Sequence, residues 1–197
     1  MTTQYSHALI SDTTGKRAVL FHIHGGAYTK GTAWEHEGKY LAARQDVVVV
    51  TINYSLSIFG FFDSDGDGVW ENYGFWDMRM ALQWVQDNIA AFGGDKDRVT
   101  IFGSSSGGMT VTQLAASPVF EGLFHRLISQ SGTMLCPRLL RRRSAEIYSK
   151  VLNGFNCDST ECLKQVLHPS APNLHKKENN KRNKNKNMLA DDITKLN

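Results

Sequence analysis

Short apolar runs rich in β-branched residues recur along the chain, and each is followed by glycines or by a helical pattern. Residues 18–23 and 47–52 are two such runs, and the second is apolar almost without alternation, as expected for a strand covered on both faces. Residues 99–102 predict a third strand, and Leu127 with Ile128 predicts the centre of a fourth. This alternation indicates an α/β fold with a mostly parallel central sheet flanked by helices.

The segment 77–92 has the period of an amphipathic helix. Its apolar positions, three or four residues apart, are Met78, Ala81, Leu82, Val85, Ile89 and Phe92. The pair Gly93-Gly94 then predicts its end. Because parallel neighbours need a crossover connection, we expect the strands at 47–52 and 99–102 to be parallel neighbours joined through this helix.

The periodic pattern ends near residue 173. Residues 176–187 contain no apolar residue, so they cannot offset the entropy that ordering would cost. We therefore expect one domain at 1–172 and a disordered basic tail, rich in Asn and Lys, at 173–197. A nuclear-localisation or anion-binding tract is the alternative to a merely solvated tail.

The net charge of +3 comes from this tail, because residues 176–187 carry +5 and the remainder carries −2. No basic stripe lies on a predicted folded element, so we expect no nucleic-acid partner. The sequence contains no window of 18 apolar residues, so we predict no transmembrane helix. Residues 1–16 also lack the apolar core of a signal peptide.

The candidate chemistry follows the strand at 99–102, where the sequence is G-S-S-S-G at 103–107. A strand that runs into G-x-S-x-G and then into a helix-forming stretch is the context of a nucleophile elbow, with Ser105 as its central serine. The N-terminus of that helix aims the backbone N–H of Ser106 at an oxyanion formed beside Ser105. A flexible Gly/Ser loop is the alternative, since the five-residue motif alone is weak.

A second glycine motif, H-G-G-A at 24–27, follows the first predicted strand. A loop of this type supplies further oxyanion donors to a nucleophile elbow, so the backbone N–H groups of Gly26 and Ala27 are candidates. His24 precedes the serine and lies beside these donors, which favours a supporting role over that of catalytic base. A plain Gly-Gly turn is the alternative.

Together these motifs resemble the type-B carboxylesterases, which include the cholinesterases. The similarity spans about residues 19–166, and its densest part, 92–107, meets every fixed position of the family's serine active-site signature. Further blocks that look like family blocks lie at 72–77, 79–85 and 130–132. The resemblance implies a partial α/β-hydrolase fold.

By this resemblance the activity is hydrolysis of a small carboxylic ester through an acyl-serine intermediate, without a cofactor. Ser105 would be acylated, and the N–H groups of Gly26, Ala27 and Ser106 would form the oxyanion hole. The alternative is a non-catalytic cholinesterase-like adhesion or binding protein, in which the fold is kept while the nucleophile is free to change. The retained Ser105 favours the esterase.

Three departures from the family pattern affect this expectation. Ser104 stands where the family usually has Glu, and Ser106 where it usually has Ala. The family's triad acid and histidine lie far downstream of the serine, whereas only 92 of the 197 residues follow Ser105. The downstream histidines, none in the family's context, are His125, His168 and His175. We therefore expect an internal piece of an esterase, which lacks the general base and hydrolyses esters weakly.

The three cysteines are relevant to the cellular compartment, because disulfides form in oxidising compartments. Cys157 and Cys162 occupy the place where the family closes a small disulfide loop, and two reduced thiols in a cytosolic protein are the alternative. The family resemblance implies a secreted or extracellular protein, and the missing signal peptide keeps a cytoplasmic location open. Cys136 is left over and is expected to be a buried free thiol. Three cysteines without C-x-x-C spacing do not indicate a zinc site.

Two further motifs are expected to be incidental. The segment D-S-D-G-D-G at 63–68 copies half of a calcium-binding loop, but Gly74 stands where the bidentate Glu belongs. An acidic surface loop is favoured, and no metal site is predicted. Asn53 begins a formal glycosylation sequon directly after a buried strand, so glycosylation is not expected there.

Overall fold

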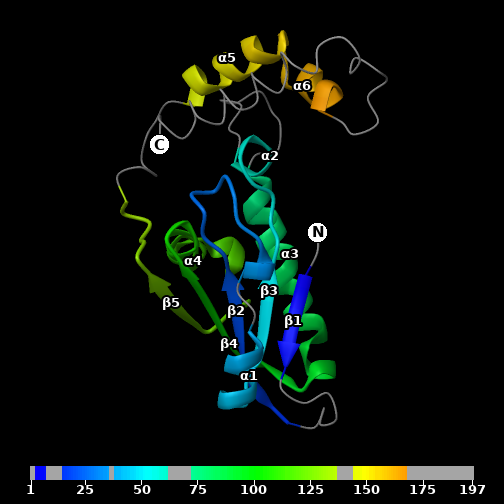
Figure 1. Ribbon diagram of the computed structural model, residues 1–197, viewed down its shortest axis with the longest axis vertical. Helices are drawn as coiled ribbons and strands as arrows, with labels where there is room; N and C mark the ends of the chain where they lie inside the picture. The colour runs from blue at the N-terminus through cyan, green and yellow to red at the C-terminus, as the bar shows by residue number, and fades with distance from the viewer. Residues whose placement is uncertain (1–2, 8–14, 36–37, 62–71, 137–143, 168–197) are drawn as a thin grey trace. The chain divides into compact units, whose positions relative to one another are not determined.

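The computed structural model describes residues 3–7, 15–35, 38–61, 72–136 and 144–167 (Figure 1). The chain divides into two compact units: a sheet unit, Met1–Phe61 with Tyr73–Pro137, and a helical unit, Phe62–Asn72 with Arg138–Asn197. The domain at 1–172 stays a prediction. The basic tail and the calcium-like segment at 63–68 lie outside the described residues.

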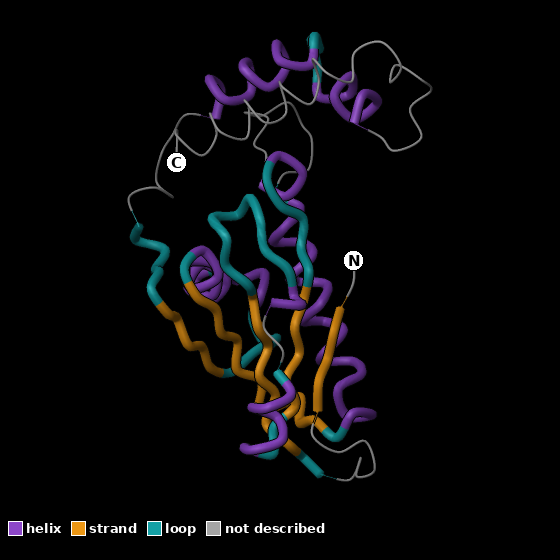
Figure 2. The backbone as a smooth tube through the Cα atoms, in the orientation of Figure 1, coloured by secondary structure: helices purple, strands orange, loops and turns teal. Residues whose placement is uncertain are grey.

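The sheet unit is built on five strands in the spatial order β1-β3-β2-β4-β5 (Figure 2). Their bounds are β1 Thr3–His7, β2 Arg17–Ile23, β3 Val48–Ile52, β4 Gly94–Ser104 and β5 Arg126–Gln130. β1 pairs antiparallel with β3, and all other neighbours are parallel. The four strands predicted from the apolar runs are therefore present, and three of them are longer or shorter than predicted by one or more residues.

The predicted neighbourhood of β3 and β4 is wrong. β2 lies between them, and its Val19 pairs with Val48 of β3 on one side and with Val99 of β4 on the other. The physical reason is that β2 is apolar enough to be buried along both edges, so the crossover from β3 passes over it to reach β4. The succession of strand, helix and strand between residues 47 and 102 correctly indicated a parallel crossover. It carries no signal for how many strands lie between the two that the crossover connects.

Strand β1 was not predicted at all. Its sequence, T-Q-Y-S-H, has no apolar run. It pairs with β3 in a fixed register, Tyr5 opposite Val50. An edge strand of this kind is held mainly by backbone hydrogen bonds, which leave no hydrophobic pattern in the sequence.

The helices of the sheet unit are α1 Lys39–Gln45, α2 Ile58–Phe61, α3 Tyr73–Asn88 and α4 Ser106–Ala116, with 3₁₀ turns η1 Ala33–Glu35, η2 Ile89–Phe92 and η3 Pro118–Phe120. The helix predicted at 77–92 is confirmed, although it begins four residues earlier and ends in the 3₁₀ turn. Gly93 stops it with a φ of 73°, and its N–H donates to the carbonyl of Ala90 at 3.0 Å. A left-handed residue at this point favours glycine, as predicted.

One hydrophobic cluster joins alternate residues of three strands to the helices on one face of the sheet. Its members include Val19, Phe21, Ile23, Val48, Val50, Ile52, Met78, Leu82, Val85, Val99, Ile101, Val111 and Leu114. Because α3 and α4 both contribute to it, both cover this face, and Figure 1 shows α3 behind the sheet. The alternate residue Val49 points to the opposite face, where it lies against Gly38 at the start of α1.

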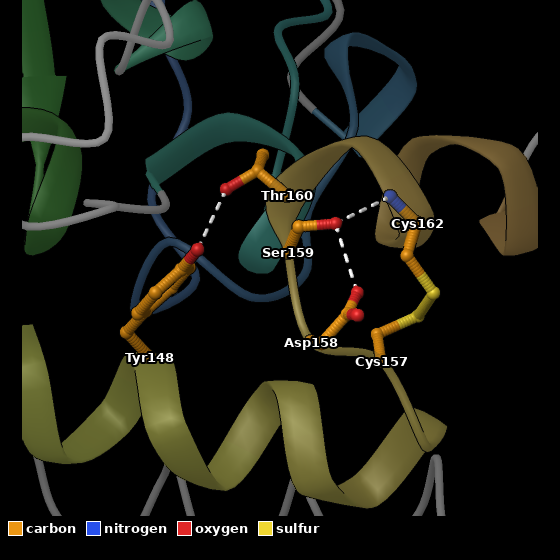
Figure 3. Close-up of a disulfide and its surroundings, with 6 residues drawn as sticks. All are labelled: Tyr148, Cys157, Asp158, Ser159, Thr160 and Cys162. Atoms are coloured by element: carbon orange, nitrogen blue, oxygen red, sulfur yellow. Dashed lines mark hydrogen bonds between the residues drawn. A yellow bond between two sulfur atoms is a disulfide. The ribbon is translucent and has the colours of Figure 1, made fainter.

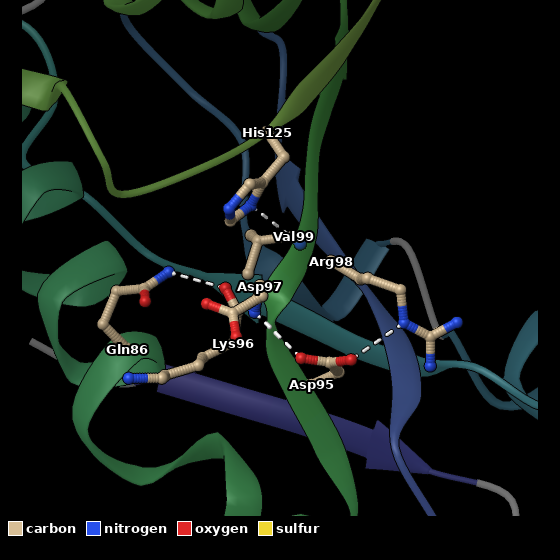
Figure 4. A network of polar contacts seen from close by, with 7 residues as sticks. All are labelled: Gln86, Asp95, Lys96, Asp97, Arg98, Val99 and His125. Atoms are coloured by element: carbon tan, nitrogen blue, oxygen red, sulfur yellow. Dashed lines mark hydrogen bonds and ion pairs between the residues drawn. The ribbon is translucent and has the colours of Figure 1, made fainter.

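A polar network fixes the beginning of β4 (Figure 4). The Asp95 carboxylate accepts hydrogen bonds from the backbone N–H of Asp97 and from Nε of Arg98, each at 3.0 Å. The Asp97 N–H, and then Arg98, hold the pKa of Asp95 below its usual range. Nearby, the backbone N–H of His125 donates to the Val99 carbonyl at 2.8 Å, which sets the register of β5 against β4.

The helical unit contains α5 Ser144–Phe155 and α6 Thr160–Leu167 (Figure 3). Between them Cys157 and Cys162 are joined by a disulfide, with their Cα atoms 5.5 Å apart. The hydroxyls of Tyr148 and Thr160 lie 3.0 Å apart and connect the two helices. The connection between α5 and α6 is thus held both covalently and by a hydrogen bond.

The different burial of two side chains on α3 predicts different losses of stability when each is replaced by alanine. Leu82 is fully buried, whereas Met80, two residues away, is 63% exposed. We expect Leu82→Ala to lower the free energy of unfolding by about 2–5 kcal/mol, since it leaves a cavity. The matched control, Met80→Ala, should change it by less than about 0.5 kcal/mol. Guanidinium unfolding followed by circular dichroism measures both, and equal losses would contradict the packing described here.

Candidate active site

Ser105 occupies the turn between β4 and α4 with a strained backbone. Its φ is 56° and its ψ is −122°, a conformation that costs a non-glycine residue about 1–3 kcal/mol. Two hydrogen bonds hold it: the Ser105 N–H donates to the Gln130 carbonyl at 2.8 Å, and the Ser105 carbonyl accepts from the Met109 N–H at 2.9 Å. The residue is exposed, so the elbow presents its hydroxyl to solvent, as the G-x-S-x-G motif predicts.

The glycines of the motif are required by contact between backbones. A Cβ at Gly103 would lie 2.6 Å from the carbonyl carbon of Gly107 and from the oxygen of Ile23. A Cβ at Gly107 would collide with the same Ile23 oxygen. Real Cβ atoms do not approach this closely, so β2, β4 and the first turn of α4 can meet only where side chains are absent.

The block Q-S-G at 130–132 supports the elbow from the other side. Gln130 accepts the Ser105 N–H, and a Cβ at Gly132 would collide with the Ser105 carbonyl oxygen. The Ser129 hydroxyl donates to the Gly108 carbonyl at 3.0 Å. In the sequence this block only resembles a family block. The structure shows that it fixes the backbone of Ser105.

The H-G-G-A loop crosses directly over the elbow. A Cβ at Gly25 would lie 2.6 Å from the Ser104 oxygen and 3.5 Å from the Ser105 Cβ. The next two residues are left-handed, with φ values of 113° at Gly26 and 55° at Ala27. Among the described residues, neither the N–H of Gly26 nor that of Ala27 has a hydrogen-bond acceptor. The loop therefore brings two available donors next to the candidate nucleophile.

His24 lies beneath this loop rather than facing the hydroxyl. It is 1% exposed, its Nδ1 lies 2.8 Å from the Gly25 carbonyl oxygen, and its ring stacks on Tyr54 with centroids 4.3 Å apart. The Tyr54 hydroxyl donates to the His24 carbonyl at 2.6 Å, and burial raises the pKa of Tyr54. These contacts support the interpretation of His24 as a residue that holds the loop.

Two side chains, Asp77 and Asn53, hold the surrounding loops, a role that the sequence did not indicate for either. The Asp77 carboxylate accepts the Ser55 N–H at 2.8 Å, which gives this family position a structural role. The Asn53 side-chain oxygen accepts the Ala33 N–H at 2.9 Å and the Thr32 hydroxyl at 3.2 Å. Asn53 therefore participates in loop packing.

Among the described residues, no downstream histidine or carboxylate is hydrogen-bonded to the Ser105 hydroxyl. His125 lies at the beginning of β5, beside Val99, whereas Ser105 follows the end of β4. His168 and His175 lie outside the described residues.

Other candidate groups are placed as follows. Cys136 is a free thiol, half-buried where a buried one was expected. In the described part of the chain, no group of three or more His, Cys, Asp or Glu residues could hold a metal ion. The described helices include none that is long and apolar enough to cross a membrane.

Comparison with known proteins agrees with this arrangement of serine and glycine loops. The model of the Carboxylesterase family matches residues 5–191. The chain belongs to the carboxylesterase family. The resemblance inferred from the motifs is confirmed.

Two human relatives illustrate the extent of the match. Carboxylesterase 3 from Homo sapiens is 42% identical over 167 residues, which cover 82% of this carboxylesterase chain and 29% of the relative. Cocaine esterase from Homo sapiens is 46% identical over 143 residues, which cover 73% of this chain and 26% of the relative. The chain thus spans less than a third of the length of these relatives.

Solved esterase structures share the fold. A thermophilic pNB esterase matches with a TM-score of 0.76 and 32% identity, over 92% of this chain and 36% of that one. A Geobacillus stearothermophilus carboxylesterase matches with a TM-score of 0.73 and 38% identity, over 81% of this chain and 34% of that one. The predicted α/β-hydrolase fold class is confirmed, for the part of the fold that this carboxylesterase chain contains.

The contact between Gly132 and Ser105 yields a steric prediction. Gly132→Ala places a methyl group against the Ser105 carbonyl oxygen, so we expect the elbow to shift and the reaction of Ser105 with a fluorophosphonate probe to slow by at least about tenfold. Gly122→Ala is the control, because a Cβ there meets nothing within 4 Å, although its φ of 77° strains the backbone. Unchanged probe kinetics in Gly132→Ala, with the variant folded, would contradict the prediction.

Proposed function

We propose that this carboxylesterase chain supplies the nucleophile and the oxyanion hole of a serine carboxylic ester hydrolase. The observation that carries the proposal is the exposed, left-handed Ser105 at the N-terminus of α4, crossed by a loop with two available N–H donors. The Ser105 hydroxyl would attack the ester carbonyl carbon. The N–H groups of Gly26, Ala27 and Ser106 would stabilise the negative charge that develops on the carbonyl oxygen.

The reaction needs a base and an acid that the described residues do not place at Ser105. In the proposed cycle a histidine outside the described residues takes the proton from the Ser105 hydroxyl as the tetrahedral intermediate forms. The same imidazolium then protonates the alcohol oxygen as the acyl–oxygen bond breaks, which leaves an acyl-serine. Water, deprotonated by the histidine, then attacks the acyl carbon. The bond from that carbon to the Ser105 oxygen breaks, the imidazolium returns its proton to Ser105, and the carboxylic acid is released.

Covalent chemistry in the structural relatives supports the acyl-serine step. Juvenile hormone esterase from Manduca sexta, which matches this chain with a TM-score of 0.70 and 32% identity over 78% of this chain and 30% of that one, was solved with OTFP covalently attached. The relatives reported above are esterases by name, and no observation favours the non-catalytic adhesion protein. We therefore propose a small carboxylic ester as the substrate and no cofactor.

The residue before the nucleophile, Ser104, affects the turnover rate that we expect. Ser104 is half-buried beside the elbow, where the family usually has Glu. A carboxylate there would help to organise charge and water around the histidine, and a serine hydroxyl carries no charge for that purpose. We expect this esterase to turn over more slowly than a relative that retains the Glu. Ser106 in place of Ala changes nothing essential, because only its backbone N–H is used.

A location outside the reducing cytosol fits the helical unit. The disulfide between Cys157 and Cys162 is stable in an oxidising compartment, such as the secretory pathway or the extracellular space. In the reducing cytosol the two thiols would remain reduced. We propose that the protein is secreted or extracellular.

Probe labelling tests the proposal directly. We expect a fluorophosphonate to label the 197-residue chain slowly at Ser105, and p-nitrophenyl acetate hydrolysis to stay near background, because loss of the histidine typically costs about 10⁶ in turnover. Ser105→Ala should abolish labelling. Ser117→Ala, at the far end of the same helix, should leave it unchanged.

A longer version that carries the family's downstream acid and histidine should label rapidly and stoichiometrically. A Ser105-dependent burst at ordinary enzyme rates in the 197-residue chain would instead assign the base to a histidine within it, His168 or His175 being the first to test. Absence of labelling in both proteins would show that the esterase proposal is wrong.

A further inference from the structure

The proposed oxyanion hole is divided between two elements that are distant in sequence. Gly26 and Ala27 belong to the loop after β2, whereas Ser106 is the first residue of α4. A carbonyl oxygen can receive all three hydrogen bonds only if the loop and the helix keep a fixed separation. The inference below rests on the proposed function, because it concerns the contact that sets this separation.

Tyr28 is the third consecutive left-handed residue of the loop, with a φ of 62°. A bulky residue rarely adopts this conformation unless its surroundings hold it. Its backbone carbonyl accepts the Ser57 N–H at 2.7 Å, and its ring meets Phe61 edge-on with centroids 4.7 Å apart. Both the backbone and the ring of Tyr28 are therefore anchored to the segment around α2.

The phenol of Tyr28 points in the other direction, to α4. The Thr110 hydroxyl donates to the Tyr28 oxygen at 3.2 Å, and the Tyr28 hydroxyl donates to the Gln113 side-chain oxygen at 3.3 Å. Thr110 and Gln113 follow Ser106 by four and seven residues, so all three lie on one face of the helix. The loop thus contacts the same helical face that begins at Ser106.

Thr110 connects this contact to the oxyanion donor itself. It is fully buried, and its hydroxyl lies 2.8 Å from the Ser106 carbonyl oxygen, to which it can also donate. The single Thr110 proton can serve either acceptor. When it is donated to the Ser106 carbonyl, the Tyr28 hydroxyl can donate to the Thr110 oxygen instead of to Gln113, so the two side chains can be hydrogen-bonded in both states. Burial raises the pKa of Tyr28, so the phenol remains protonated and able to donate at neutral pH.

We propose that Tyr28 is a positioning residue, whose phenol, held by Thr110 and Gln113, fixes the oxyanion loop against α4. Without the hydroxyl the ring can remain in contact with Phe61 while the loop moves relative to the helix. The N–H groups of Gly26 and Ala27 could then no longer donate to the oxyanion in good geometry at the same time as the N–H of Ser106. Because the oxyanion is present in the tetrahedral intermediate and its flanking transition states but not in the bound ester, the loss should fall on kcat and leave KM unchanged.

The test compares variants that change one hydroxyl at a time, in a version of the protein that hydrolyses p-nitrophenyl acetate. We expect Tyr28→Phe and Thr110→Val each to lower kcat roughly fivefold to tenfold with KM unchanged, which corresponds to the loss of one hydrogen bond. Rates are normalised to the number of sites that a fluorophosphonate titrates, which separates slow sites from unfolded protein. The double variant should be no slower than the slower single variant, because both remove the same contact.

Two controls separate positioning from general stability. Thr110→Ser keeps the hydroxyl and should retain the kcat of the unaltered protein. Tyr40→Phe removes a phenol that is on α1 and 69% exposed, and it should change neither kcat nor KM. Additive losses in the double variant, an equal loss in Thr110→Ser, or unchanged kcat in Tyr28→Phe would each overturn the proposal.

A second measurement does not require catalysis. The N–H groups of Thr29 and Lys30 donate to the Gly26 carbonyl at 3.1 Å, so their hydrogen exchange reports how firmly the loop is held. We expect Tyr28→Phe and Thr110→Val to speed exchange of these amides about tenfold in the 197-residue chain, while Tyr40→Phe leaves it unchanged. If Ser105 never reacts but exchange responds in this way, the esterase proposal fails and the tether is retained. If exchange does not respond, the tether itself is wrong.

Discussion

The close approach of four backbone segments, which leaves no room for side chains between them, is the constraint on which the rest of the structure depends. Around Ser105, the ends of β2 and β4, the first turn of α4 and the segment after β5 approach so closely that a Cβ at Gly103, Gly107 or Gly132 would strike backbone atoms. Contact at this distance lets backbone groups position one another directly. The strained conformation of Ser105 persists because its N–H and its carbonyl are both held within this contact.

The hydrophobic cluster and the candidate active site are therefore two parts of one arrangement. Burial of Val19, Phe21 and Ile23 fixes β2 between β3 and β4, and the residue after Ile23 begins the loop that crosses the elbow. The same core holds α4 through Val111 and Leu114, so the helix N-terminus is placed by apolar packing several residues away. Precision at Ser105 follows from the rigidity of the close-packed interior.

Sequence patterns predicted the elements that depend on local residue spacing. They missed the features that depend on contacts between segments distant in the chain. Apolar runs and helical periodicity identified β2, β3, β4, β5 and α3, and glycine spacing identified both loops at Ser105. The position of β2 between β3 and β4 was missed, because strand order leaves no mark on the periodicity. The polar strand β1 and the link from Tyr28 to Thr110 were missed for a similar reason: hydrogen bonds between residues some 40 to 80 positions apart have no local signature.

The donors of the proposed oxyanion hole belong to the main chain, and this changes how sequence variation at the site is to be judged. An exchange of one side chain for another at Ala27 or Ser106 removes no N–H group, and only proline would do so. Natural variants can therefore change the exposed side chain at Ala27 while the backbone N–H donors are retained.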